Sequence, residues 1–122
     1  MTVDEAARRV RAAMGHRVAG FCYVASEAVY HLAGGRRSGL TPMVIRVEGR
    51  PPVGTHWFLR VDARWTRDGR VPARRVDVTA GQFRPRLTAG EYGLARGCGF
   101  RTRRPSVGAR EIIAAVLREA RR

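Results

Sequence analysis

The stretch that decides the fold lies in the first third of the chain, at residues 20–35, and reads GFCYVASEAVYHLAGG. Apolar side chains recur through it at spacings of three and four residues, which is typical of an amphipathic helix. The two glycines at its end favour the left-handed backbone with which many helices stop. The pattern therefore predicts a helix from Cys22 to about Ala33 that begins at a cysteine.

The same periodicity predicts two further helices. The first covers about Asp4 to Met14, and its two leading acids suit the positive end of a helix dipole. The last runs to about Ala120 and starts after Ser106, which can cap it through its hydroxyl group. Its expected core stripe comprises five aliphatic residues: Val107, Ile112, Ile113, Val116 and Leu117.

Between these helices the pattern changes to one typical of strands. Alternating and β-branched residues predict strands at 43–48, 55–62 and 76–79, and Asp68-Gly69 marks a hairpin turn. Residues 81–105 are rich in glycine, proline and arginine and are predicted as loop. The order of elements predicts a single α+β domain over residues 1–122, with helices packed on a small antiparallel sheet.

Length and composition restrict the class of protein. A chain of 122 residues can bury one modest core, and an apolar fraction of 44% is ordinary for a folded domain. No apolar run approaches the roughly 20 residues that span a bilayer, so no membrane partner is expected. The sequence opens with acids after Met1 and lacks a secretory pattern, so we expect a cytoplasmic location.

The charge is strongly basic, with 24 basic residues against 10 acidic ones and a net charge of +14. Every basic residue is arginine, which is typical in part of a GC-rich genome. Such a charge attracts polyanions without specificity. Dedicated nucleic-acid binding is the other interpretation, although aromatic residues for base stacking are few and no known binding motif is present.

The cysteine and histidine spacing gives no support for a disulfide framework or a metal centre. The only cysteines are Cys22 and Cys98, and two cysteines are too few to form a disulfide framework. There is no Cys-x-x-Cys, and no histidine lies within four residues of another or of a cysteine. We therefore expect a protein without metal or cofactor.

Three residues far apart in the chain, Cys22, His56 and Asp77, are candidates for thiol catalysis. A thiol attacks a carbonyl as thiolate, and its ordinary pKa of about 8.5 leaves little thiolate at neutral pH. A helix start and a neighbouring imidazolium both favour the thiolate, and a third group must orient the imidazole ring. His56 and Asp77 lie on successive predicted strands, which can place their side chains together on one face.

The order of these motifs resembles the transglutaminase-like branch of the papain-like cysteine fold. It is also similar to small uncharacterised proteins of bacteria and their phages with the layout CYVASEA…HW…DxTAxQF. The matching segments are 20–35, 55–59 and 76–83, about a quarter of the chain. The resemblance implies a papain-like core in which Cys22 is the nucleophile, His56 the general base and Asp77 the orienting group. It further implies attack on an amide or thioester carbonyl through an acyl-enzyme.

Two features depart from that family pattern. Residues 60–74 are long and arginine-rich for a simple hairpin, which leaves the register between His56 and Asp77 open. Papain-type enzymes often carry a glutamine before the cysteine to bind the oxyanion, whereas the only glutamine here is Gln82. We therefore expect the Cys22 backbone N–H to serve as one oxyanion donor, with His16 as a candidate for the second.

Each candidate also has a purely structural interpretation. Cys22 suits apolar packing in a helix, because cysteine is among the most buried residue types. His56 suits a hydrogen-bonded histidine of a strand, and Asp77 suits a turn closed through its own side chain.

Several other polar residues are interpreted as structural. Cys98 is predicted to be a non-catalytic loop residue, and His31 a histidine with a local hydrogen bond inside its helix. Glu27 is interpreted as a solvated carboxylate, and the run Arg101 to Arg104 as a solvated stretch.

Three classes of function follow from these observations. The leading hypothesis is a cysteine peptidase, amidase or acyltransferase that acts on a peptide or protein substrate, with the basic surface favouring acidic or phosphate-bearing substrates. The second is a module that binds nucleic acid or another polyanion. The third is a catalytically inactive relative of the fold that binds an acidic partner protein.

Overall fold

The computed structural model describes residues 1–122 as an α+β fold, which confirms the predicted class. Its helices are α1 (Val3–Met14), α2 (Cys22–Leu32), α3 (Ala89–Tyr92) and α4 (Val107–Ala120), with short 3₁₀ helices η1 (Gly35–Ser38) and η2 (Ala80–Gln82). Its strands are β1 (Leu40–Val47), β2 (Gly54–Val61), β3 (Arg64–Thr66), β4 (Gly69–Val71), β5 (Arg74–Val76) and β6 (Arg96–Gly97). None of the helices has the length and apolar character needed to cross a bilayer.

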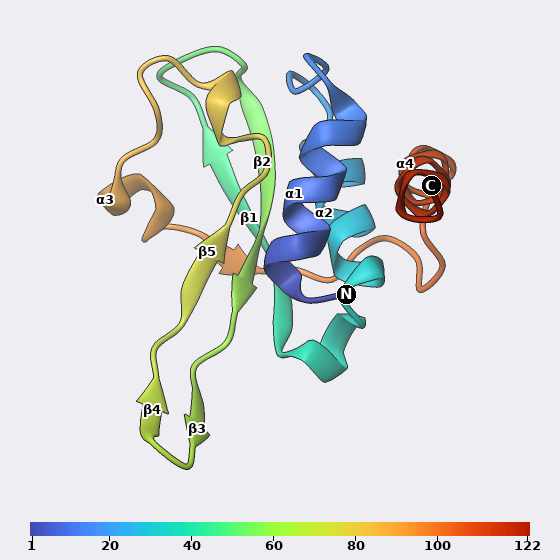
Figure 1. Ribbon diagram of the computed structural model, residues 1–122. Coiled ribbons are helices and arrows are strands. Elements are labelled where there is room, and N and C mark those ends of the chain that lie inside the picture. The colour runs from blue at the N-terminus through green and yellow to red at the C-terminus, as the bar shows by residue number, and fades with distance from the viewer.

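The main sheet has the strand order β5-β2-β1-β6, and every neighbouring pair is antiparallel. Helices α1 and α2 pack on one face with α4 outside them, and the chain between β5 and β6, with α3, covers the other face (Figure 1). Each face therefore has its own core. The helical core is the larger, and the second core gathers six apolar residues: Met43, Ile45, Val47, Phe58, Phe83 and Leu87.

Helix α2 is the centre of the helical layer, because it packs against α1, α4 and β2. Its buried side chains Ala25 and Ala28 are small, so its neighbours approach closely. At Gly108 of α4, an added Cβ would lie only 2.9 Å from a methyl carbon of Val24. The predicted stop is confirmed, since Gly34 adopts the left-handed backbone with φ of 98°.

The predicted core stripe of α4 is wrong at its two ends. The buried residues are Ala109, Ile112 and Val116, whereas Val107 is 61% exposed and Leu117 is 38% exposed. Helix α4 lies at the outside of the helical layer (Figure 1) and packs only against α1 and α2 among the helices and strands with substantial contacts to it. A three-residue stripe is therefore enough to hold it.

The third predicted strand is displaced toward the amino terminus. Strand β5 ends at Val76, so residues 77–79 lie in a turn rather than in the sheet. The Asp77 carboxylate accepts a hydrogen bond from the Thr79 backbone N–H at 3.2 Å, and such local bonds compete with strand pairing.

The segment predicted only as loop contains ordered structure. Helix α3 is short, and it starts with a capping box in which Thr88 and Glu91 exchange side-chain and backbone hydrogen bonds. The Thr-x-x-Glu spacing that encodes this box is visible in the sequence. The backbone bonds to Thr88 and the charge of Arg50 hold the pKa of the Glu91 carboxyl below its ordinary value.

The hairpin predicted at Asp68-Gly69 is confirmed. Strands β3 and β4 pair around it, and Gly69 has a positive φ of 117° that favours glycine. The hairpin extends beyond the main sheet (Figure 1).

The interpretation of Glu27 as a solvated carboxylate is wrong, because its side chain is completely buried. It accepts hydrogen bonds from the Ser106 hydroxyl at 2.6 Å and from the Ser106 backbone N–H at 3.2 Å. Ser106 in turn caps α4 by accepting from the Ala109 N–H. Glu27 therefore connects the middle of α2 to the start of α4, where a carboxylate also suits the helix dipole.

We predict that Glu27→Ala lowers the free energy of unfolding by about 2–4 kcal/mol, because it leaves a cavity and removes the acceptor of two partly buried Ser106 donors. The matched control is Glu111→Ala, which removes an exposed carboxylate from α4 and should change stability by less than about 0.5 kcal/mol. Urea denaturation followed by circular dichroism measures both. Equal effects of the two substitutions would contradict the role assigned to Glu27.

Candidate active site

The fold brings Cys22, His56 and Asp77 together from three separate elements. Cys22 is the first residue of α2, His56 lies on β2, and Asp77 directly follows β5. Strands β2 and β5 pair Leu59 with Val76. Continuing that register by one residue places Asp77 on the same sheet face as His56, as its diagonal neighbour across the two strands. The register that the sequence left open is thus the one that joins them.

His56 and Asp77 form a buried pair, with 2.6 Å between imidazole Nε2 and carboxylate Oδ2. Their side chains are only 2% and 4% exposed. The imidazole is packed edge-on against Phe83, with ring centroids 4.8 Å apart, and stacks more loosely on Phe58. This packing fixes the orientation of the ring, and the carboxylate fixes the proton on Nε2.

The Asp77 carboxylate has all of its hydrogen-bonding capacity used. Oδ2 also accepts a hydrogen bond from the Tyr92 hydroxyl at 2.6 Å, and Oδ1 accepts from the backbone N–H and the hydroxyl of Thr79. The two sequence interpretations of Asp77 therefore coexist, since one oxygen closes the turn and the other contacts His56.

Tyr92 was missed by the sequence analysis, because nothing in its glycine-rich surroundings marks it. Burial and the hydrogen bond to Asp77 raise the pKa of its phenol well above the ordinary value. The guanidinium of Arg75 lies 4.0 Å above its ring. Tyr92 therefore stays protonated at neutral pH and serves as a permanent hydrogen-bond donor to the carboxylate.

The protonated form of His56 is favoured by its neighbours. Burial by itself lowers the pKa of an imidazole, but hydrogen bonding to Asp77 and Cys22 and the charges of both outweigh it and raise the pKa of His56 to about 9. At neutral pH the ring therefore carries a positive charge opposite the Asp77 carboxylate.

Cys22 presents a free, partly exposed thiol beside this ring. No side chain caps the first turn of α2, so the helix start faces the site without a competing acceptor. The thiol also donates to the Thr55 carbonyl oxygen at 3.9 Å.

A cleft of about 360 Å³ opens over the thiol. Cys22, Thr55 and His56 line it, together with aromatic side chains that include Tyr23 and Trp57. Asp77 lies behind the ring and does not line the cleft. A larger cavity of about 700 Å³ lies at the other end of α2 and contains none of the three residues. The chemistry of the side chains, rather than the size of the hollow, therefore marks the candidate site.

Gln82 is the second residue that the sequence analysis did not place. It lies on η2, lines the cleft, and has its side-chain amide nitrogen 3.3 Å from His56 Nδ1 and 3.1 Å from the Thr79 hydroxyl. His16, proposed as an oxyanion donor, is exposed and lies outside this cleft. That expectation is wrong, because the turn after α1 carries His16 to a different hollow.

Two other candidates lie away from the thiol. Cys98 directly follows β6, where its backbone N–H donates to the Pro42 carbonyl, and it does not line the cleft. His31 lies near the far end of α2. Its Nε2 is buried without a hydrogen-bond partner, so the predicted local bond at that nitrogen is wrong.

Comparison with known proteins finds no matching family model, no matching curated protein and no matching solved structure.

We predict a pH-dependent stability that originates in His56. Its pKa of about 9 in the folded state exceeds the unfolded value of about 6.5, so protonation stabilises the fold. This stabilisation is fully present below about pH 6.5 and is lost as the pH rises through about 9. Denaturant unfolding across that window measures the loss, on the order of 3 kcal/mol.

The imidazole itself can be followed by NMR, because the chain has only three histidines. In Asp77→Asn, the pKa of His56 should fall and the free energy of unfolding should depend less on pH. In His16→Ala, which removes an exposed imidazole, the pKa of His56 and the pH dependence should stay unchanged. A wild-type His56 that titrates near an ordinary histidine value would contradict the prediction.

Proposed function

We propose that the protein is a thiol-dependent acyl hydrolase or acyltransferase with Cys22 as nucleophile, His56 as general base and Asp77 as orienting group. The observation that carries the proposal is the buried His56–Asp77 pair, held at 2.6 Å beside a free thiol at a helix start. A merely structural cysteine does not require a neighbouring histidine–aspartate pair. Burying these two charged side chains away from water is costly, which argues that the pair has a function. This arrangement supports a papain-like or transglutaminase-like core.

The first half of the reaction starts from a thiolate–imidazolium pair, in which the Cys22 proton has moved to His56 Nδ1 while Nε2–H stays bound to Asp77; the raised pKa of His56 favours this form. The thiolate then attacks the carbonyl carbon of the substrate, a C–S bond forms, and the carbonyl electron pair moves to oxygen. Collapse of this intermediate expels the leaving group, which receives the proton from Nδ1. The product of these steps is a thioester acyl-enzyme.

In the second half, a water molecule or an acceptor amine approaches the thioester. His56 Nδ1 removes its proton, the new nucleophile attacks the acyl carbon, and the C–S bond breaks to return the Cys22 thiolate. This step restores the thiolate–imidazolium pair from which the reaction began. Side chains, substrate and solvent supply every proton and electron pair in both halves.

The oxyanion needs hydrogen-bond donors aimed at the substrate oxygen. The Cys22 backbone N–H at the start of α2 is one candidate. We assign the second to the Gln82 side-chain amide, which lines the same cleft and contacts His56. This assignment replaces His16.

The cleft also suggests a substrate class. Arg101 is exposed at its wall, next to the aromatic rings of Tyr23 and Trp57. A guanidinium beside apolar rings suits a peptide with an acidic side chain near the reacting carbonyl. The substrate proposed is therefore an acidic peptide or protein segment.

We predict selective alkylation of Cys22, with Cys98 as an internal control. At about pH 6, where an ordinary thiol is below about 1% thiolate, the Cys98→Ser protein should react with iodoacetamide at least about tenfold faster than the Cys22→Ser protein. Adding His56→Ala to Cys98→Ser should abolish the difference. Intact-mass spectrometry gives the rates.

The same assay separates an enzyme from an inactive relative of the fold. With an activated acyl ester, the Cys98→Ser protein should accumulate a mass-shifted acyl-enzyme, and Gln82→Ala should slow its formation without slowing alkylation. Equal reactivity of Cys22 and Cys98, or no acylation, would contradict the enzyme proposal.

A second candidate function, binding of single-stranded nucleic acid, is favoured by the β3–β4 hairpin. Trp65 on it is 79% exposed and pairs across the strands with Arg70. Arg64 and Arg67 flank it, and none of these arginines has a carboxylate partner. An exposed aromatic ring among unpaired guanidinium groups suits base stacking with phosphate contacts.

We predict that Trp65→Ala weakens binding of a short oligothymidine by an amount equivalent to about 1–3 kcal/mol, because it removes one stacking platform. The matched control is Leu94→Ala, which truncates another exposed apolar side chain. Fluorescence anisotropy at rising salt measures both. Loss of all binding near physiological salt, or equal effects of the two substitutions, would indicate charge attraction alone.

A further inference from the structure

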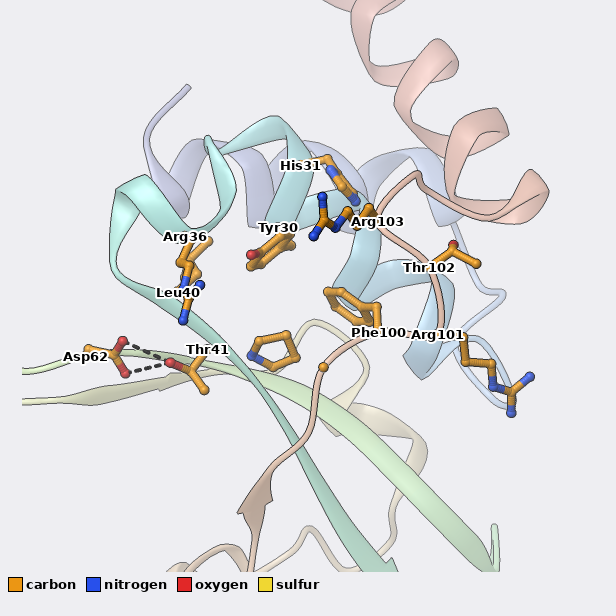
Figure 2. A pocket seen from close by; sticks show the side chains of 12 residues that line it. Tyr30, His31, Arg36, Leu40, Thr41, Asp62, Phe100, Arg101, Thr102 and Arg103 are labelled. Atoms are coloured by element: carbon orange, nitrogen blue, oxygen red, sulfur yellow. Dashed lines mark hydrogen bonds between the residues drawn. The ribbon is translucent and has the colours of Figure 1, made fainter.

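A cavity of about 700 Å³ lies at the carboxyl-terminal end of α2. It is enclosed by the end of α2, by η1, by the start of β1 and by residues 99–103 (Figure 2). Its volume is in the range of small-molecule sites, which is about 300–1,000 Å³. The proposed acyl-transfer chemistry makes no use of it.

The lining of this cavity carries excess positive charge. Arg36, Arg101 and Arg103 contribute to it, and none of the three forms an ion pair or a side-chain hydrogen bond. The only acid of the lining is Asp62, which is already bound by Arg60 at 2.8 Å and by the Thr41 hydroxyl at 2.9 Å. The arginines of this cavity are therefore left without a counter-charge.

Polar groups inside the cavity are also unpartnered. Nε2 of His31 is buried and has no hydrogen-bond partner, although buried polar atoms nearly always have one. Figure 2 shows the Arg103 side chain extended beside His31, and Arg36 on the other side of Tyr30. The Tyr30 hydroxyl makes no hydrogen bond within the protein. A bound group with several acceptor oxygens would complement the guanidinium groups and the Tyr30 hydroxyl.

We propose that this cavity binds the phosphate group of a small phosphorylated ligand, held between Arg36 and Arg103. A guanidinium group matches two oxygens of a phosphate through its planar fork, and two such groups balance a dianion. Tyr30 donates its hydroxyl to the same ligand, and Phe100 supplies an apolar wall for the rest of it. Asp62 marks the side of the cavity that the anion avoids.

This site is separate from the thiol cleft. Phe100 packs edge-on against both Tyr23 and Tyr30, with ring centroids 5.5 and 5.3 Å apart, and so stands between the two hollows. Arg101 contributes to both linings, and its side chain points away from the larger cavity in Figure 2. Phosphate binding therefore requires neither Cys22 nor the proposed acyl-enzyme.

Isothermal titration calorimetry with inorganic phosphate and with adenosine monophosphate tests the proposal, at an ionic strength of about 0.15 M so that distant charges are screened. Both should bind saturably to the wild-type protein and equally well to Cys22→Ala. Arg36→Ala and Arg103→Ala should each weaken binding at least about tenfold, equivalent to about 1.4 kcal/mol.

The matched control is the double variant Arg118→Ala, Arg121→Ala, which removes two exposed guanidinium groups from the end of α4 and should bind as the wild type does. Circular dichroism verifies that every variant is folded. The His31 ring resonances should shift on phosphate addition in the wild type and not in Arg103→Ala.

Three results would overturn the proposal. One is the absence of saturable binding of either phosphate compound. Another is an equal loss of affinity in the α4 control, which would identify the net charge as the cause. The third is equally tight binding of succinate, which would assign the cavity to dicarboxylates.

Discussion

The hydrogen-bonded pair of His56 and Asp77 is the constraint around which this small protein is arranged. A charged pair excluded from water is tolerated only when its remaining hydrogen-bonding capacity is used, and removal of one partner typically costs about 3–5 kcal/mol. Tyr92 and Thr79 meet that requirement for the carboxylate, and Phe83 packs against the ring. The chain between β5 and β6 thus has ordered structure because it completes a polar contact inside the second core.

Helix α2 organises the other side of the sheet. Its first residue, Cys22, lies at the thiol cleft, and its last turn, with Tyr30 and His31, lines the larger, arginine-lined cavity. Between these two ends, Glu27 binds Ser106 at the start of α4. A helix of 11 residues, about 16 Å long, therefore contributes to the thiol cleft, to the attachment of α4 and to the arginine-lined cavity. Small side chains on its buried face let the neighbouring helices fix its position, and with it the position of the thiol.

The sequence predicted the elements whose signals are local. The periodicity of α1 and α2, the glycine stop at Gly34 and the Asp68-Gly69 turn were all recognisable, and the structure confirms them. The end of β5 could not be recognised in the sequence, because the Asp77 side chain closes a turn where strand pairing was expected. Glu27 was misread since nothing next to it reveals Ser106, which lies 79 positions away. Tyr92 and Gln82 come from the segment with the weakest periodicity.

The sequence by itself determined the α+β class, the basic surface, and the three residue types whose chemistry can activate a thiol. Only the tertiary structure decided that Cys22, His56 and Asp77 meet, that Gln82 and not His16 accompanies them, and that unpaired arginines surround a second cavity. The physical reason is that helix and turn preferences act between residues a few positions apart. Strand register, burial and the pairing of charges depend instead on the whole chain closing around its two cores.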